Sequence, residues 1–122
     1  MIYPETKLNV GDNSGAKLVK CVKVLKFSKS SGAKPASIAI VSIRKVKYSK
    51  RLAKGEISRG VIVRLKKSIQ RDTGSSIRFD NNSLILIDPK NVPLGTRIFG
   101  PIFKELRFGD FPKILTLAKT II

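Results

Sequence analysis

The sequence predicts a mainly β fold, in which a small β-barrel is followed by a short C-terminal helical and loop region. Its 122 residues are enough for one domain with a buried core. Short apolar runs recur between clusters of Gly, Pro, Asn, Asp and Ser, and no long helical pattern separates them. Five or six strands at this spacing favour a closed or nearly closed barrel. We therefore expect a single domain over 1–122, with the barrel over about 1–100 and the C-terminal region over about 101–122.

The first expected strands flank a turn. Residues 7–10 lead into GDNSG at 11–15, and the β-branched run at 16–27 predicts a long, bulged strand. The turn could also act as an anion nest, because Gly and short polar residues expose backbone N–H groups. No Walker pattern or helix follows it, which favours the simpler interpretation as a turn. The small, polar and basic segment 28–35 predicts an exposed loop.

Two longer strands are expected next. Residues 36–46 are apolar on both faces from Ile38 to Ile43, which is typical of a buried barrel strand. Residues 47–56 predict a basic loop or hairpin tip. The run 57–67 then alternates, and the alternation predicts Val61, Val63 and Leu65 on one side of the strand.

The last expected elements are short. A turn at 71–76 precedes a segment in which Ile77 and Phe79 share one face, and residues 83–88 predict a short buried strand. A Pro- and Gly-containing loop covers 88–95. Helical turns are expected only at 104–108 and 112–119, the second with Pro112 in its first turn, where proline is tolerated.

Net charge is the strongest functional signal. Lys and Arg number 25 against 8 Asp and Glu, which gives +17 and a pI near 10.5. A compact domain with this excess repels itself, and a bound polyanion would neutralise it. A membrane is the weaker candidate, since neither a spanning apolar run nor a long basic amphipathic helix is present. Nucleic acid is therefore the expected partner.

The positive charge is concentrated in the first half of the chain. Residues 1–67 hold 17 basic and 3 acidic side chains, and 44–67 alone hold ten basic residues against one acid. Lys acts on phosphate as a mobile point charge, whereas Arg offers a planar fork with two hydrogen bonds. Neither reads a sequence unless it reaches base edges, so we expect recognition of folded RNA by shape and backbone.

Catalytic resources are few. The chain has no His, and its carboxylates form no acid pair or metal-ligand pattern. Cys21 lies within an apolar run and is better explained as a small buried hydrophobe than as a nucleophile. We expect no enzyme activity, no cofactor, no metal and no small-molecule substrate.

The aromatic residues define an alternative. A free single-strand-binding module that regulates expression would stack bases on aromatic side chains, and it would depend on Phe99 or Phe103. Four of the eight aromatic residues, Phe99, Phe103, Phe108 and Phe111, cluster in the weakly charged second half, away from 44–67, although folding could bring the two together. The separation favours phosphate binding without base stacking.

Five separated blocks resemble one family. They are LNVGDNSGAK (8–17), GVIVR (60–64), IRFDNN (77–82), GTRIFGPIFKELR (95–107) and KILTLA (113–118). In this order and over nearly the same length, they are similar to ribosomal protein fourteen of the large subunit, the universal L-fourteen family. The absence of any extension resembles its bacterial and organellar type.

The resemblance implies a five-stranded β-barrel and a structural, non-enzymatic role in the large ribosomal subunit. It implies binding to large-subunit ribosomal RNA, intersubunit bridges to small-subunit RNA, and contacts with large-subunit proteins three and nineteen. It also implies docking of a ribosome silencing factor, which would make the chain a recruitment platform.

The resemblance and the charge pattern together assign site residues. The expected RNA contacts are Lys17, Arg44, Lys45, Lys47, Lys50, Arg51, Lys54, Lys66, Lys67, Arg71 and Arg78. The expected contacts with the silencing factor or neighbouring proteins are Thr96, Arg97, Phe99, Lys113 and Thr116.

One departure from the family concerns a turn. KPAS at 34–37 stands where the family usually has a Gly-Asp step, so this turn must be built differently. Composition also bears on the source, because many Lys and Ile with few Ala fit an AT-rich genome. We expect the ribosome of an organelle, a mitochondrion ahead of a plastid, with bacterial cytoplasm as the alternative.

Overall fold

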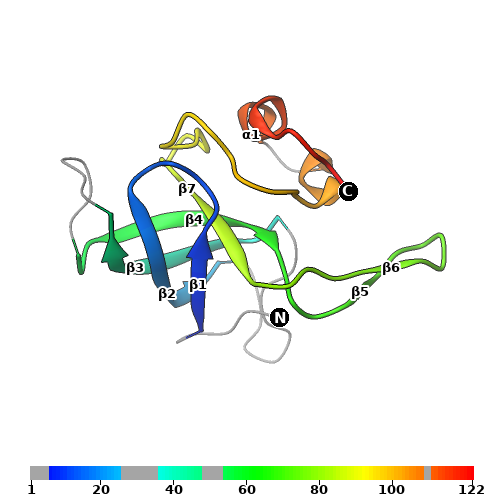
Figure 1. The fold of residues 1–122 in the computed structure, drawn as a ribbon, viewed down its shortest axis with the longest axis horizontal. Helices are drawn as coiled ribbons and strands as arrows, with labels where there is room; N and C mark the ends of the chain where they lie inside the picture. The colour runs from blue at the N-terminus through cyan, green and yellow to red at the C-terminus, as the bar shows by residue number, and fades with distance from the viewer. Residues whose placement is uncertain (1–5, 26–35, 48–53, 109–110) are drawn as a thin grey trace.

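A computed structural model describes residues 6–25, 36–47, 54–108 and 111–122. Five strands form a closed barrel in the order β1-β2-β3-β4-β7, as the mainly β prediction requires (Figure 1). They are β1 (Lys7–Val10), β2 (Ala16–Val24), β3 (Ile38–Val46), β4 (Ile57–Arg64) and β7 (Ser83–Ile87). Neighbours pair antiparallel except β1 and β7, whose parallel pairing closes the barrel.

The remaining elements lie outside the barrel. β5 (Ile69–Gln70) and β6 (Ser76–Ile77) form a hairpin that projects from it (Figure 1). The 3-10 helix η1 (Lys104–Phe108) and helix α1 (Pro112–Leu117) stand together at one edge. The prediction of helix only at the end is confirmed for the described residues, which include no helix long and apolar enough to cross a membrane.

The barrel interior is one apolar cluster. Leu8, Val19, Val41, Ile62 and Leu86 contribute to it, all buried. Cys21 is also inside, as predicted, and burial raises the pKa of its thiol. Phe103 reaches this cluster from the C-terminal region, where its ring meets that of Phe79 edge-on. The C-terminal region is thus anchored in the barrel core.

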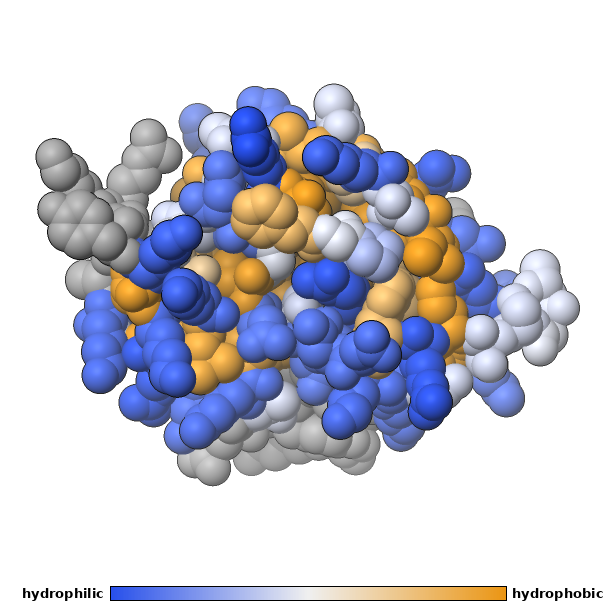
Figure 2. Space-filling view, in the orientation of Figure 1, coloured by the Kyte–Doolittle hydropathy of each residue, from blue (hydrophilic) through white to orange (hydrophobic). Residues whose placement is uncertain are grey.

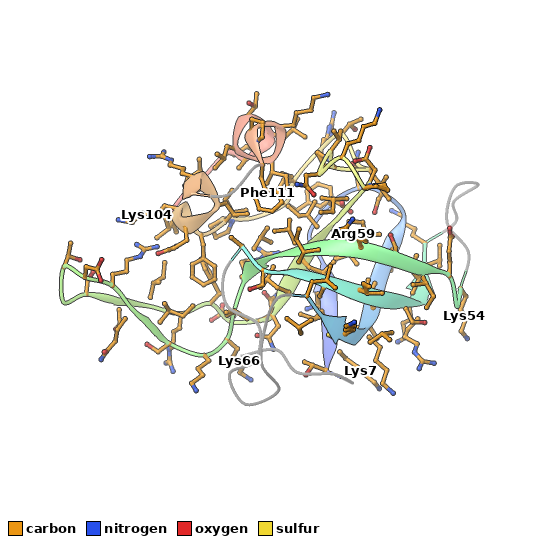
Figure 3. The ribbon with its side chains drawn as sticks, turned by 180° about the vertical axis from the view of Figure 1, so that it is seen from behind. Lys7, Lys54, Arg59, Lys66, Lys104 and Phe111 are labelled. Carbon is orange, nitrogen blue, oxygen red and sulfur yellow. The ribbon has the colours of Figure 1, made fainter. Side chains whose placement is uncertain are left out.

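A second apolar cluster covers the outside of β4 and β7. Val61, Val63 and Ile85 face Ile102 and Ile114 of the C-terminal region there, and all five are buried. Phe111 belongs to the same cluster and lies between α1 and the barrel (Figure 3). Every residue of β7 is buried, because the strand has a covered face on each side.

Two strand predictions are wrong in detail. Leu65 belongs to the interior cluster and Val63 to the outer one, although strict alternation put them on the same side. A register shift between Ile62 and Arg64 adds one residue, which turns the following side chain over. In β3, only Ala39, Val41 and Ile43 are buried, and the intervening residues are half-buried on the open face of the barrel.

The turn that departs from the family has an unusual backbone. Ala36 has φ 66, in the left-handed region that glycine adopts at least cost. The Ala36 N–H donates to the Ile62 carbonyl at 3.1 Å. The following residue, Ser37, is also bonded to β4, because its carbonyl accepts from the Ile62 N–H at 2.9 Å. These two bonds to β4 hold the chain in this conformation without the family's usual glycine.

Candidate nucleic-acid interface

The pairing of β1 with β2 places two lysines opposite each other on the outside of the barrel. Lys7 is the register partner of Lys20, while the adjacent Leu8 and Val19 fill the interior. Since successive side chains of a strand point to opposite faces, both ammonium groups project outward. Like charges at directly opposed positions destabilise a sheet. An anion bound between them would relieve that repulsion.

Further cations gather around this pair. They line a groove of about 360 Å³ on the outside of the barrel. We call it the basic groove, and its lining is Lys7, Leu18, Lys20, Arg44, Lys45 and Lys54. Figure 3 shows Lys7 and Lys54 on the same side of the barrel, with Lys104 at the opposite corner beside the helical region.

The basic groove is electrostatically unbalanced. Five of its six lining residues are cationic and none is acidic. The salt bridge between Arg71 and Glu105 lies outside this groove. Hydrophilic side chains crowd the lower part of the face shown in Figure 2, over β1 and β2. The groove can therefore bind phosphates with Lys ammonium groups and the Arg44 guanidinium.

Three of the predicted RNA contacts meet in this groove, namely Arg44, Lys45 and Lys54. Lys7 and Lys20 were missed, because their proximity depends on the pairing of two strands rather than on local charge density. A signal existed: if 7–10 and 16–24 pair across a tight turn, their lysines come into register. Lys50 and Arg51 lie outside the described residues.

The other predicted RNA contacts are dispersed. Lys17 and Lys47 are exposed and line a second groove beside Phe99. Lys66, Lys67 and Arg78 are exposed near the base of the β5–β6 hairpin. Arg71 makes contacts within the protein: its Nε lies 2.9 Å from Glu105 Oε1, and its Nη2 donates to the Ile122 carbonyl at 2.6 Å. These bonds tie the hairpin to the C-terminal region, and with the bond from Nη2 to Glu105 Oε2 they use three of the five N–H donors of Arg71.

Arg64 is a different kind of cation, because the fold half-buries it. Its Nε is buried with no hydrogen-bond partner among the described residues, and burial lowers the pKa of its guanidinium. The guanidinium passes between two glycines. A Cβ on Gly100 would overlap Nη1, and a Cβ on Gly11 would lie 3.2 Å from Nη2. Both glycines thus make room for this side chain.

The predicted protein contacts fall on the side of the C-terminal region. Thr96, Arg97 and Phe99 are exposed, and so are Lys113 and Thr116 on α1. Ile98 and Ile114 belong to one buried cluster, which brings the two groups of exposed residues to neighbouring parts of the surface. Phe103, one of the two rings that the single-strand alternative named for stacking, is buried in the barrel core and cannot stack on a base, whereas Phe99 is exposed.

A closed barrel whose outer face carries a groove lined by five cations is the arrangement expected of a nucleic-acid-binding β-barrel protein. The family model of ribosomal protein L14p/L23e matches residues 1–122, the whole chain. The chain therefore belongs to the L14p/L23e family of ribosomal proteins. Membership implies a structural constituent of the large ribosomal subunit that takes part in translation and binds ribosomal RNA and ribosomal neighbours. Families of this kind are generally not enzymes.

Proposed function

We propose that the chain binds large-subunit ribosomal RNA through the basic groove and fixes the folded RNA in place by its backbone phosphates. The observation that carries the proposal is the convergence of five cations, from three strands and one turn, on a groove without an acid. In a chain of net charge +17, each bound phosphate also lowers the self-repulsion of the protein.

The geometry favours folded RNA over base readout. Lysines supply four of the five cations, and an ammonium group contacts phosphate without reading sequence. A-form RNA exposes phosphates and 2′-hydroxyls across its shallow groove, so proteins recognise it largely by shape. A fixed cluster of charges on a rigid barrel suits that mode, and the dispersed contacts Lys66, Lys67 and Arg78 would extend it.

We further propose a protein-facing surface on the C-terminal side. Thr96, Arg97, Lys113 and Thr116 are exposed on neighbouring segments of the C-terminal side, with Phe99 beside them. This surface fits the family's expected docking of a silencing factor and its contacts with large-subunit proteins three and nineteen. Bridges to small-subunit RNA, an organellar source with the mitochondrion first, and a single domain over 1–122 belong to the same proposal.

The test is cosedimentation. The native protein should sediment with large subunits on a sucrose gradient, and the organelle that carries those subunits would identify its compartment. The variant Lys7→Gln/Lys20→Gln/Arg44→Gln/Lys45→Gln should lose this association. A matched variant, Lys90→Gln/Lys104→Gln/Arg107→Gln/Lys119→Gln, removes the same charge from exposed sites elsewhere and should retain it. Equal loss by both variants would show a general charge effect and refute the groove.

A further inference from the structure

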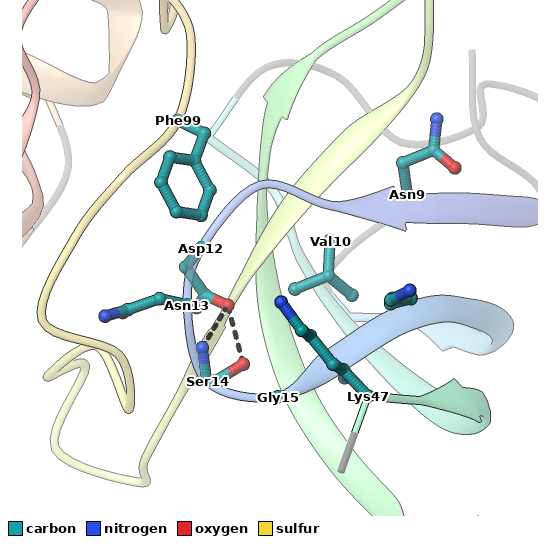
Figure 4. Close-up of a pocket in the computed structure, with 10 residues that line it drawn as sticks. Asn9, Val10, Asp12, Asn13, Ser14, Gly15, Lys47 and Phe99 are labelled. Atoms are coloured by element: carbon teal, nitrogen blue, oxygen red, sulfur yellow. Dashed lines mark hydrogen bonds between the residues drawn. The ribbon is translucent and has the colours of Figure 1, made fainter. Parts of the chain in front are cut away.

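A second groove lies where β1 ends and the turn to β2 begins. Its volume is about 460 Å³, and we call it the Phe99 groove (Figure 4). Its lining is Asn9, Val10, Asp12, Asn13, Ser14, Gly15, Ala16, Lys17, Lys47 and Phe99. Lys7 and Asn9 point outward from one strand, two residues or about 7 Å apart, so one extended ligand can enter both grooves.

The wall that carries Phe99 is fixed without a ligand. The Phe99 N–H donates to the Gly11 carbonyl at 2.7 Å. Two residues away, Asn13 Oδ1 accepts from the N–H groups of Thr96 and Arg97 at 2.7 and 2.9 Å. Gly95 allows this approach, because a Cβ there would lie 2.6 Å from Asn13 Oδ1. The aromatic ring is therefore held by a turn more than eighty residues away in sequence.

The groove combines three chemical functions. Phe99 forms an aromatic wall of the groove, and 55% of its surface is accessible. Lys17 and Lys47 supply two exposed cations, and Figure 4 shows the Lys47 side chain directed into the space below Phe99. Asn9 adds an exposed amide that can both donate and accept hydrogen bonds. An aromatic face, two cations and an amide match the base and the phosphate of a nucleotide.

The acid in this lining does not oppose an anion. Asp12 is buried, with 5% of its surface accessible. Its Oδ1 accepts from the Ser14 hydroxyl at 2.6 Å and from the Ser14 N–H at 3.1 Å. The carboxyl therefore stabilises the turn, and the exposed charges of the groove are those of the two lysines.

A protein partner fits this composition less well. Fully buried parts of protein interfaces are depleted of Lys, whereas two lysines contribute to this groove. Single-stranded RNA, in contrast, is bound by stacking its bases on aromatic rings while cations follow its backbone. The volume also lies within the range of about 300–1,000 Å³ that small-ligand sites occupy.

We propose that the Phe99 groove binds one unpaired RNA nucleotide, whose base stacks on Phe99 and whose phosphate contacts Lys17 and Lys47. The inference rests on the proposed RNA-binding function and adds to it a site selective for an unpaired position. It also assigns the Phe99 ring to RNA rather than to a protein partner. The backbone on one side of this nucleotide continues into the basic groove.

The experiment compares two RNA probes on the full chain. One probe is an RNA hairpin whose only unpaired bases are those of its tetraloop. The other is the same hairpin with a single bulged adenosine in its stem. Phe99→Leu keeps the apolar bulk and removes the stacking face, while Phe99→Tyr keeps that face. Phe99→Leu should weaken binding of the bulged probe about 5- to 150-fold, the loss that corresponds to one stacked base. Phe99→Tyr should bind it as the wild type does.

The unbulged hairpin separates the two proposals. Phe99→Leu should leave its affinity unchanged, while substitutions in the basic groove weaken both probes. If the wild type binds both probes and Phe99→Leu binds each of them with the affinity of the wild type, the nucleotide site is refuted and the basic groove stands. If wild type binds neither probe, the proposed function itself fails. Loss of a protein partner by Phe99→Leu, with RNA affinity unchanged, would assign the ring to a protein interface and also overturn the inference.

Discussion

Removing two charges from the basic groove should change the salt dependence of RNA binding by a calculable amount. Each neutralised phosphate contributes about 0.7 to 0.9 to the slope of log affinity against log salt. The five cations of the groove therefore predict a slope of about −3.5 to −4.5 for their share of binding. The variant Lys20→Gln/Lys45→Gln removes two of them and should make the slope shallower by about 1.4 to 1.8.

Filter binding of a large-subunit RNA fragment over a series of potassium chloride concentrations measures this slope. The matched control is Lys90→Gln/Lys104→Gln, which removes the same charge from exposed positions outside the groove. Its slope should stay within experimental error of the wild type. An unchanged slope in the groove variant, or an equal change in the control, would refute the assignment of phosphate contacts to this groove.

Four further substitutions test the fold by urea denaturation. Gly100→Ala should lower the free energy of unfolding by about 2–3 kcal/mol, because φ is +81 and the added Cβ overlaps Arg64. Gly74→Ala has a similar φ of +85 but no atom near the added Cβ, so it should lose only the backbone strain energy of about 1 kcal/mol. Equal losses of stability in Gly74→Ala and Gly100→Ala would contradict the packing argument. Phe103→Ala should lose about 3–5 kcal/mol, since the ring is fully buried, and a loss under about 1 kcal/mol would disprove its anchoring role. Burial raises the pKa of Asp12 above 3.8, so the folded state holds this proton more tightly than the unfolded chain does. Relative to Asp12→Asn, wild-type stability should then decrease as pH rises from 3.8 through the raised pKa, and an increase over that range would reverse the argument.

Local patterns were enough to predict the strands but not their faces everywhere. Alternation and turn residues located the strands at 7–10 and 83–87 and the hairpin turn between Gln70 and Ser76. The predicted side of Leu65 was wrong, because a count of alternating apolar positions cannot detect one extra residue in a strand. Whether an apolar outer face is covered is equally non-local: β7 is buried on both faces, whereas Ile38 and Ile40 on the outer face of β3 are only half-buried.

The candidate site could be predicted in part for the same reason. Charge density identified Arg44, Lys45 and Lys54, which are close in sequence. Lys7 and Lys20 reach the groove through the register of β1 and β2, which depends on the packing of whole strands. The position of Phe99 beside Lys17 and Lys47 also depends on long-range contacts, through the hydrogen bonds of Gly11 and Asn13. Phe99 is far from Lys17 and Lys47 in the sequence, and the fold brings the three together in the Phe99 groove.

The path of the C-terminal region makes the outer faces of the barrel strands differ. Val61 and Val63 of β4 and Ile85 of β7 face outward, and they would be exposed on a bare barrel. Ile102 and Ile114 of the C-terminal region bury them, and Lys104 and Lys113, which are exposed on this side, belong to the C-terminal region itself. The outer faces of β1 and β2 have no such cover among the described residues, and the basic groove forms there. The proposed RNA-binding side of the barrel is therefore the side that its own C-terminal region leaves uncovered.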